Sequence, residues 1–239
     1  MAAWQRAETV LMTVLGIDTA TSRGSVALAR PGEVLAAVPL LERGAHARDL
    51  LLRIDGLLQK TGLRPSDLHG LAVTVGPGSF TGVRIGLATA KGFAYSLGIG
   101  LAGLSTLEAL ARAAAPVRGG AQPPLVCATI EAGRGEVYAA LFRWVGGEPV
   151  RETADLSYRP EDLLRALPTG ARVVGDGSAA LERAVRETGR EIEVIDPWPM
   201  LAATLALWGG RTLLPGSPYV RGGARPNYVR PSDAEVVKR

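Results

Sequence analysis

Residues 71–98 read LAVTVGPGSFTGVRIGLATAKGFAYSLG, and this stretch decides the fold. Its first five residues are mostly apolar and predict a buried strand. The turn Gly76-Pro77-Gly78 follows, and glycine with proline ends a strand and redirects the chain. Ser79 or Thr81 then caps a helix, because a short hydroxyl side chain accepts a hydrogen bond from a free N–H of the first turn. The stretch therefore predicts a strand, a tight turn and a helix.

The predicted helix carries a stripe of small residues. Glycine or alanine stands at every fourth position, and residues four apart share one helix face: Gly82, Gly86, Ala90, Ala94 and Gly98. Each interior glycine costs about 1 kcal/mol of helix propensity relative to alanine, so the stripe needs a reason. Close approach of another backbone is the best reason. Two partners are consistent with it, a helix of the same domain or another protein chain.

The elements on either side alternate. Strands are predicted at residues 13–18, 24–30, 33–40, 71–75 and 99–103, and helices at residues 46–60, 81–98 and 105–115. Pro31-Gly32 forms a hairpin turn between the second and third strands. Ser105 and Glu108 form a capping box at the start of the last of these helices. This order predicts a mixed sheet with helices on its faces, as in a ribonuclease-H-like, actin-like lobe.

The second half repeats the opening pattern. A strand, an acid, a glycine turn and a strand return, with Glu131 in the place of Asp18. We therefore predict an α/β fold of two duplicated lobes, each a mixed sheet with flanking helices. The predicted segments are a disordered tail at residues 1–11, a first lobe at 12–115, a linker at 116–124, a smaller second lobe at 125–196, and, at 197–239, a helix that returns across the lobes with an extended tail. Within the second lobe, helices are predicted at residues 160–167 and 179–188, and further strands at 172–174 and 191–195.

Composition limits the classes of function. The chain has 239 residues, 47% of them hydrophobic, and contains no apolar run long enough to span a membrane. A single cysteine, Cys127, excludes an internal disulfide and a cysteine metal cluster, and it indicates a cytoplasmic protein. The formal net charge of +4 is scattered without a dense basic block. The sequence therefore predicts at most weak or indirect contact with tRNA or other nucleic acid.

Asp18 ends the first predicted strand, and the residues after it form a candidate phosphate loop. In actin-like lobes that bind nucleotides, an acid at this point works through Mg²⁺, and small residues after it let backbone N–H groups meet phosphates. Hydroxyl groups are plentiful here, although glycine comes late. The candidate residues are Asp18, Thr19, Thr21, Ser22 and Gly24. Asp18 and Glu131 either face one cleft as an acid pair or are ordinary strand-end carboxylates.

Other candidate sites have ordinary structural alternatives. Gly175-Asp176-Gly177-Ser178 is either an anion site or a turn with an N-cap, and Gly76-Pro77-Gly78-Ser79 is either a phosphate cradle or a structural turn. The histidines, His46 and His69, form no pair on one helix face, because Leu50 stands four residues after His46. No Ser-His-acid or Cys-His signature is present. We therefore expect no metal site and no catalytic residue.

These motifs together resemble the bacterial TsaB family, also called YeaZ. The motifs that carry the resemblance are Ile17-Asp18-Thr19-Ala20-Thr21, His46, GPGSFTGVRIG at residues 76–86, Ser105-Thr106-Leu107, Gly135-Glu136-Val137-Tyr138 and Asn227-Tyr228-Val229-Arg230. The resemblance covers nearly everything from Met12 to Arg230. It implies a two-lobed actin-like protein of the pathway that makes threonylcarbamoyladenosine in tRNA, next to the anticodon.

The resemblance also implies partners. TsaB proteins are non-catalytic partners of TsaD, a metal-bearing paralogue that transfers threonylcarbamoyl to the adenosine, and TsaE, an ATPase, joins them. The family pairs with TsaD, or with a second copy when TsaD is absent, through helices of the first lobe. The His-x-x-x-His metal motif of TsaD corresponds here to His46 and Leu50, so the metal site is expected to be lost. With the stripe, this places the expected interface at Gly82, Val83, Gly86, Ala90, Ala94, Leu50 and Ile54.

Two functional hypotheses follow. In the first, the chain is a partner subunit that holds no cofactor by itself, and ATP or ADP binds only in the assembled complex. In the second, the chain is an actin-like transferase that uses ATP and Mg²⁺ at Asp18 on its own. Binding of magnesium–ATP by the isolated protein, lost in Asp18→Asn, separates the second hypothesis from the first.

Overall fold

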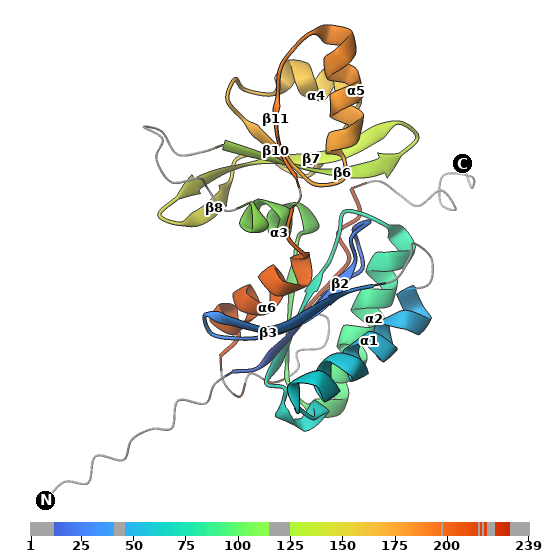
Figure 1. Cartoon of the computed structure of the whole chain (residues 1–239), viewed down its shortest axis with the longest axis vertical. Helices are drawn as coiled ribbons and strands as arrows, with labels where there is room; N and C mark the ends of the chain where they lie inside the picture. Colours follow the sequence, from blue (N-terminus) through green and yellow to red (C-terminus); the bar gives the residue numbers. More distant parts are fainter. Residues whose placement is uncertain are drawn as a thin grey trace, which may run out of the picture.

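Two lobes lie one above the other in the computed structural model (Figure 1). The structure describes residues 12–40, 46–114, 125–196, 198–214, 216, 218 and 223–229. The predicted tail at residues 1–11 and the predicted linker at residues 116–124 lie outside the described residues. Each lobe contains one mixed sheet with helices packed on it, so the predicted fold class is confirmed.

The first lobe has a five-stranded sheet of order β3-β2-β1-β4-β5. Its strands are β1 (Val14–Asp18), β2 (Ser25–Arg30), β3 (Glu33–Pro39), β4 (Gly70–Thr74) and β5 (Gly100–Leu104). The first three strands pair antiparallel, whereas β4 runs parallel to β1 and β5 runs parallel to β4. Since parallel strands end at the same edge of a sheet, Asp18 and Thr74 meet there.

Helices α1 (His46–Thr61) and α2 (Phe80–Leu97) cover one face of this sheet, with the 3₁₀ helix η1 (Pro65–Asp67) after α1 (Figure 1). The start of α2 agrees with the prediction, because the Ser79 hydroxyl accepts the Gly82 N–H at 3.1 Å. Gly98 ends the helix in the left-handed region, with φ of 67°. The strand–turn–helix unit is therefore confirmed.

The small-residue stripe of α2 faces its own lobe. Gly82, Gly86, Ala90 and Ala94 are all buried. A Cβ atom on Gly82 would lie 1.9 Å from the carbonyl oxygen of Thr19, and one on Gly86 would lie 2.3 Å from the Thr19 hydroxyl. The element that approaches these two glycines is the loop after β1, which is neither a helix nor another chain. Gly82 is needed because its backbone touches the Thr19 backbone, and Gly86 is needed because the Thr19 side chain packs on it.

The second lobe has a six-stranded sheet of order β11-β10-β6-β7-β8, with β9 paired to β7. Its strands are β6 (Leu125–Gly133), β7 (Glu136–Val145), β8 (Glu148–Arg151), β9 (Leu156–Tyr158), β10 (Arg172–Val174) and β11 (Glu193–Ile195). Helices α4 (Pro160–Ala166) and α5 (Ser178–Thr188) lie on its outer face (Figure 1). The antiparallel pair β6–β7 corresponds to β1–β2, as the repeated sequence pattern predicted.

Two helices between the sheets are exchanged between the lobes. Helix α3 (Thr106–Ala113) follows β5 of the first lobe but packs on β6, β7 and β8 of the second. Helix α6 (Leu201–Thr212) follows the second lobe but packs on β1, β2 and β4 of the first. The approach of α6 is close, since a Cβ atom on Gly16 would lie 2.0 Å from the carbonyl oxygen of Ala202. The exchange joins both lobes through one shared core.

Candidate functional sites

The Asp18 carboxylate is enclosed at the end of β1. Its Oδ1 atom accepts hydrogen bonds from the Ala20 N–H at 3.0 Å and the Thr74 hydroxyl at 2.9 Å, and its Oδ2 atom accepts one from the Thr21 hydroxyl at 2.5 Å. Asp18 has no exposed surface. Burial raises the pKa of Asp18, and the three hydrogen bonds offset part of that rise. This carboxylate holds the loop after β1 in place and does not face solvent.

The N-terminus of α2 closes that loop. The Ser79 N–H donates to the Ala20 carbonyl at 2.8 Å, and the Thr19 hydroxyl donates to the Gly82 carbonyl at 2.7 Å. A Cβ atom on Gly78 would lie 2.4 Å from the Ala20 carbonyl oxygen. The Gly76-Pro77-Gly78 turn therefore packs against protein backbone, which favours the structural turn over a phosphate cradle.

The candidate phosphate-loop residues come together but mostly point inward. Of the five, Asp18, Thr19, Thr21 and Gly24 are buried, and only Ser22 is exposed. Glu131 is exposed whereas Asp18 is buried, so the two do not form a matched acid pair. A magnesium ion with a nucleotide needs carboxylate oxygens and backbone N–H groups that face an open cleft. The residues of the isolated chain do not fit that requirement.

Asp176 instead accepts hydrogen bonds from the turn after β1 and from strand β6. Its Oδ2 atom accepts the Ser22 N–H from the first lobe, and its Oδ1 atom accepts the Glu131 N–H from the second, each at 3.0 Å. The sequence singled out this turn as an anion site or a turn with an N-cap. The N-cap of α5 is Gly177, which makes no side-chain cap, and Asp176 supplies the anion itself.

A second carboxylate joins the lobes at Asp155. It accepts hydrogen bonds from the Ser105 hydroxyl at 3.2 Å and from the side-chain amide of Asn227 at 2.6 Å, and it pairs with Arg151. The Asn227 N–H also donates to the Val75 carbonyl at 2.7 Å. Ser105 stands at the N-cap of α3 but makes no capping hydrogen bond. The predicted capping box is therefore wrong at this residue, because Asp155 takes its hydroxyl.

An apolar groove lies between α1 and α2 on the outer side of the first lobe. Its volume is about 550 Å³, and it is lined by Leu51, Pro65, Ala88, Thr89, Gly92, Phe93, Ser96 and Leu97. Large apolar side chains are exposed on the same two helices: Leu51 is 53% exposed, Leu52 66% and Tyr95 76%.

The groove contains a second row of small residues. Ala88, Gly92 and Ser96 stand four apart on α2, and nothing lies within 4 Å of a Cβ atom built on Gly92. The spacing of this row is visible in the sequence. The interface was predicted at the stripe that begins at Gly82 because that stripe contains more glycine and alanine. The seven residues expected at the interface are all buried within this chain, including Leu50, Ile54 and Val83. The outward row, and not the predicted stripe, therefore lies on the surface of α2.

Metal and thiol chemistry have no support in the described part of the chain. There, no group of three or more His, Cys, Asp or Glu side chains is placed to hold a metal ion. His69 has a structural contact, since its Nδ1 atom accepts the Thr13 N–H at 3.2 Å. Burial raises the pKa of Cys127 to about 12. Among the helices described, none has the length and apolar character needed to cross a membrane.

The chain is similar to known proteins in sequence and in fold. A family model described as TsaD, tRNA N6-adenosine threonylcarbamoyltransferase, matches residues 35–200. The chain is 35% identical to the tRNA threonylcarbamoyladenosine biosynthesis protein TsaB of Escherichia coli over 198 residues, 78% of this chain and 82% of that protein. It is 33% identical to TsaB of Bacillus subtilis over 68% of this chain and 69% of that protein. The solved structure of YeaZ from Pseudomonas aeruginosa matches 91% of this chain and 100% of its own, with 28% identity and a TM-score of 0.71.

Proposed function

Because this chain belongs to the TsaB family of tRNA threonylcarbamoyladenosine biosynthesis proteins, we propose that it is a non-catalytic subunit that binds and supports TsaD, together with TsaE. The observation that carries the proposal is the apolar groove between α1 and α2, which the exposed Leu51 lines, with Leu52 and Tyr95 also exposed on the same two helices. Exposed apolar patches on soluble proteins mark binding surfaces. Burying a leucine side chain contributes about 1.5–3 kcal/mol, so a partner that covers this groove gains substantial stabilisation.

The groove suits a helical partner with a related fold. Its floor includes Ala88 and Gly92, and small residues at this spacing let a second helix approach closely. The TsaD family model matches this chain across both lobes, so TsaD carries corresponding helices. A second copy of this chain carries the same surface, and a two-fold pair would place like helices together. We therefore propose TsaD as the partner and the homodimer as the state formed when TsaD is absent.

The alternative, a self-sufficient ATP–Mg²⁺ transferase acting through Asp18, is not supported. Asp18 is fully buried and makes three internal hydrogen bonds, so Mg²⁺ could reach it only after the loop opened. Nucleotide binding in the assembled complex remains compatible with the proposed role, since a partner can supply its own site.

Reconstitution tests the proposal. Purified full-length chain, TsaD and TsaE are combined in all subsets, and transfer of threonylcarbamoyl to tRNA is measured. We expect no product from this chain alone, and full activity only when it is present with TsaD and TsaE. Product formed by this chain alone, or activity of TsaD with TsaE that this chain does not increase, would overturn the proposal.

A further inference from the structure

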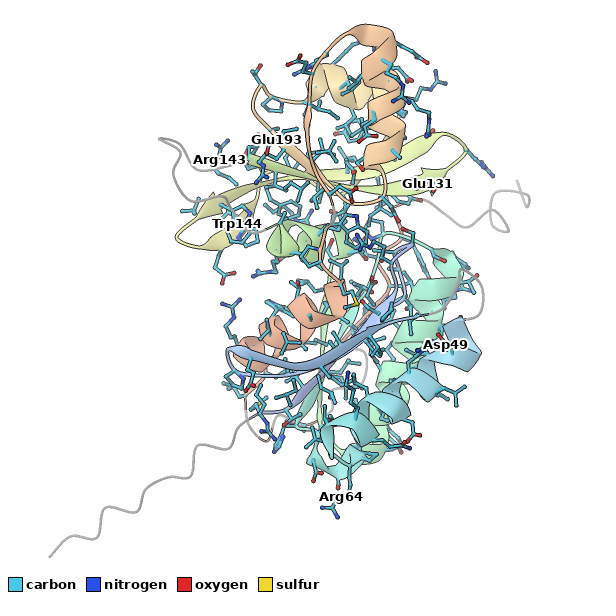
Figure 2. All side chains as sticks on the ribbon, viewed as in Figure 1. Asp49, Arg64, Glu131, Arg143, Trp144 and Glu193 are labelled. Carbon is cyan, nitrogen blue, oxygen red and sulfur yellow. The ribbon has the colours of Figure 1, made fainter. Side chains whose placement is uncertain are left out.

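The Asp176 carboxylate receives one backbone N–H from each lobe. Ser22 belongs to the turn between β1 and β2, and Glu131 belongs to β6, which is the matching strand of the second lobe. Both N–H groups lie 3.0 Å from a carboxylate oxygen. Figure 2 labels Glu131 beside the β6–β7 pair, on the side of the second sheet that faces the first lobe.

The turn that carries Asp176 is built around tight contacts with β6. Gly175 has a φ of 108°, and a Cβ atom there would lie 2.1 Å from the Thr129 carbonyl oxygen. On the other side, a Cβ atom on Gly177 would lie 2.9 Å from the Thr129 Cβ atom. Both neighbours must be glycine for the turn to sit this close. The strand therefore fixes the position from which Asp176 reaches across to the first lobe.

Other contacts hold the first-lobe turn in the same place. The Arg23 guanidinium lies 5.0 Å from the ring centre of Trp198, a buried residue between β11 and α6. Asp155 provides a separate connection between the lobes through Ser105 and Asn227. The Arg23 contact with Trp198 therefore lies next to Ser22 in the turn after β1, and the Asp155 contacts hold the lobes together elsewhere.

We propose that the Ser22 and Glu131 N–H groups form one anion site shared by the two lobes, and that Asp176 is its built-in occupant. Converging backbone N–H groups bind anions because their partial positive charges add. A carboxylate and a phosphate present similar acceptor oxygens to such a pair. Asp176 thereby excludes phosphate from the site and keeps the lobes joined. This inference is independent of the docking proposal, since it concerns the hydrogen bonds between the lobes and not the outer groove.

Hydrogen exchange of the two amides, with inorganic phosphate as the probe, tests the inference. In the full wild-type chain we expect both amides to be protected and phosphate to change nothing. In Asp176→Ala, protection of both should fall about tenfold or more, as loss of a hydrogen bond to a charged group gives. Phosphate should then restore protection at both positions. The matched control is Asp162→Ala, which removes an exposed carboxylate of α4 and should leave both amides unchanged.

Three results would overturn the inference. They are unchanged protection of Ser22 and Glu131 in Asp176→Ala, protection of the wild-type amides by phosphate, and failure of phosphate to restore protection in the variant. If Asp176→Ala does not fold, Asp176→Asn takes its place, because it keeps the size of the side chain and removes its charge. In that variant we expect partial loss of protection at both amides, and retention of full protection would be contrary evidence.

Discussion

Thr19 and Gly82 are in direct backbone contact. The Thr19 hydroxyl donates to the Gly82 carbonyl at 2.7 Å, and the Thr19 carbonyl oxygen lies 1.9 Å from where a Gly82 Cβ atom would stand. This contact uses the glycine-rich face of α2 inside the first lobe. It leaves the opposite face, with Ala88 and Gly92, available to a partner.

The inward glycines are required for folding. Leucine at Gly86 would collide with the Thr19 hydroxyl, which lies 2.3 Å from the position of its Cβ atom. We expect Gly86→Leu to lower the free energy of unfolding by about 1–3 kcal/mol or more, as overpacked cores do. Urea unfolding measures this loss. Gly92→Leu is the control on the same helix, and equal stability of the two variants would contradict the assigned packing.

Because Asp18 is buried, we expect the free energy of unfolding to depend on pH. Burial raises the pKa of Asp18 above its ordinary value of 3.8, so the folded chain holds this proton at pH values where the unfolded chain has released it. The stabilisation from this proton is complete below the unfolded pKa and is lost as the pH rises through the folded pKa. Asp18→Asn carries no charge at any pH. Its stability relative to wild type should therefore improve as the pH rises above 3.8.

Chemical denaturation at several pH values measures this difference. The control is Asp67→Asn, because a hydrogen bond from the Arg64 N–H lowers the pKa of the exposed Asp67. That lowered pKa gives stability that is present above the unfolded pKa and lost as the pH falls through the folded pKa. As the pH rises, the stability of Asp18→Asn relative to wild type should therefore increase and that of Asp67→Asn should decrease. A change in the same direction for both variants would refute the assignment for Asp18.

Asn227 fastens the C-terminal segment to both lobes. Its side chain donates to Asp155 at 2.6 Å, and its N–H donates to the Val75 carbonyl. We expect Asn227→Ala to cost about 1–3 kcal/mol of unfolding free energy, because a hydrogen bond to a carboxylate is lost. Asn227→Asp should cost more, since it places a second negative charge against Asp155. Thermal unfolding of wild type and of each variant measures the order of their stabilities. If Asn227→Asp is as stable as wild type, the result argues against this contact.

Local sequence patterns predicted the elements but not their long-range partners. Glycine and proline marked the ends of β4 and α2, and the predicted strand at residues 172–174 coincides with β10. The short strands β8 and β9 were missed, because Glu148–Arg151 and Leu156–Tyr158 are too brief to show alternation.

The site residues illustrate the same limit. The contact between Ser22 and Asp176 joins residues 154 positions apart, and no local pattern indicates it. Ser105 fits a capping box locally, yet Asp155 takes its hydroxyl in the folded chain. The stripe on α2 was detected from its spacing, but spacing alone does not tell a helix from a loop as its partner. Tertiary contacts decided each of these cases.

The most direct test of the central claim is co-elution of purified TsaD with Gly92→Leu in size-exclusion chromatography. Gly92 is exposed and has open space around it, so the variant should fold, while its new side chain fills the groove. The matched control is Ala179→Leu, at an exposed position of α5 in the second lobe. We predict that Ala179→Leu elutes with TsaD as wild type does and that Gly92→Leu elutes separately. Co-elution of folded Gly92→Leu with TsaD at the wild-type ratio would contradict docking through this groove.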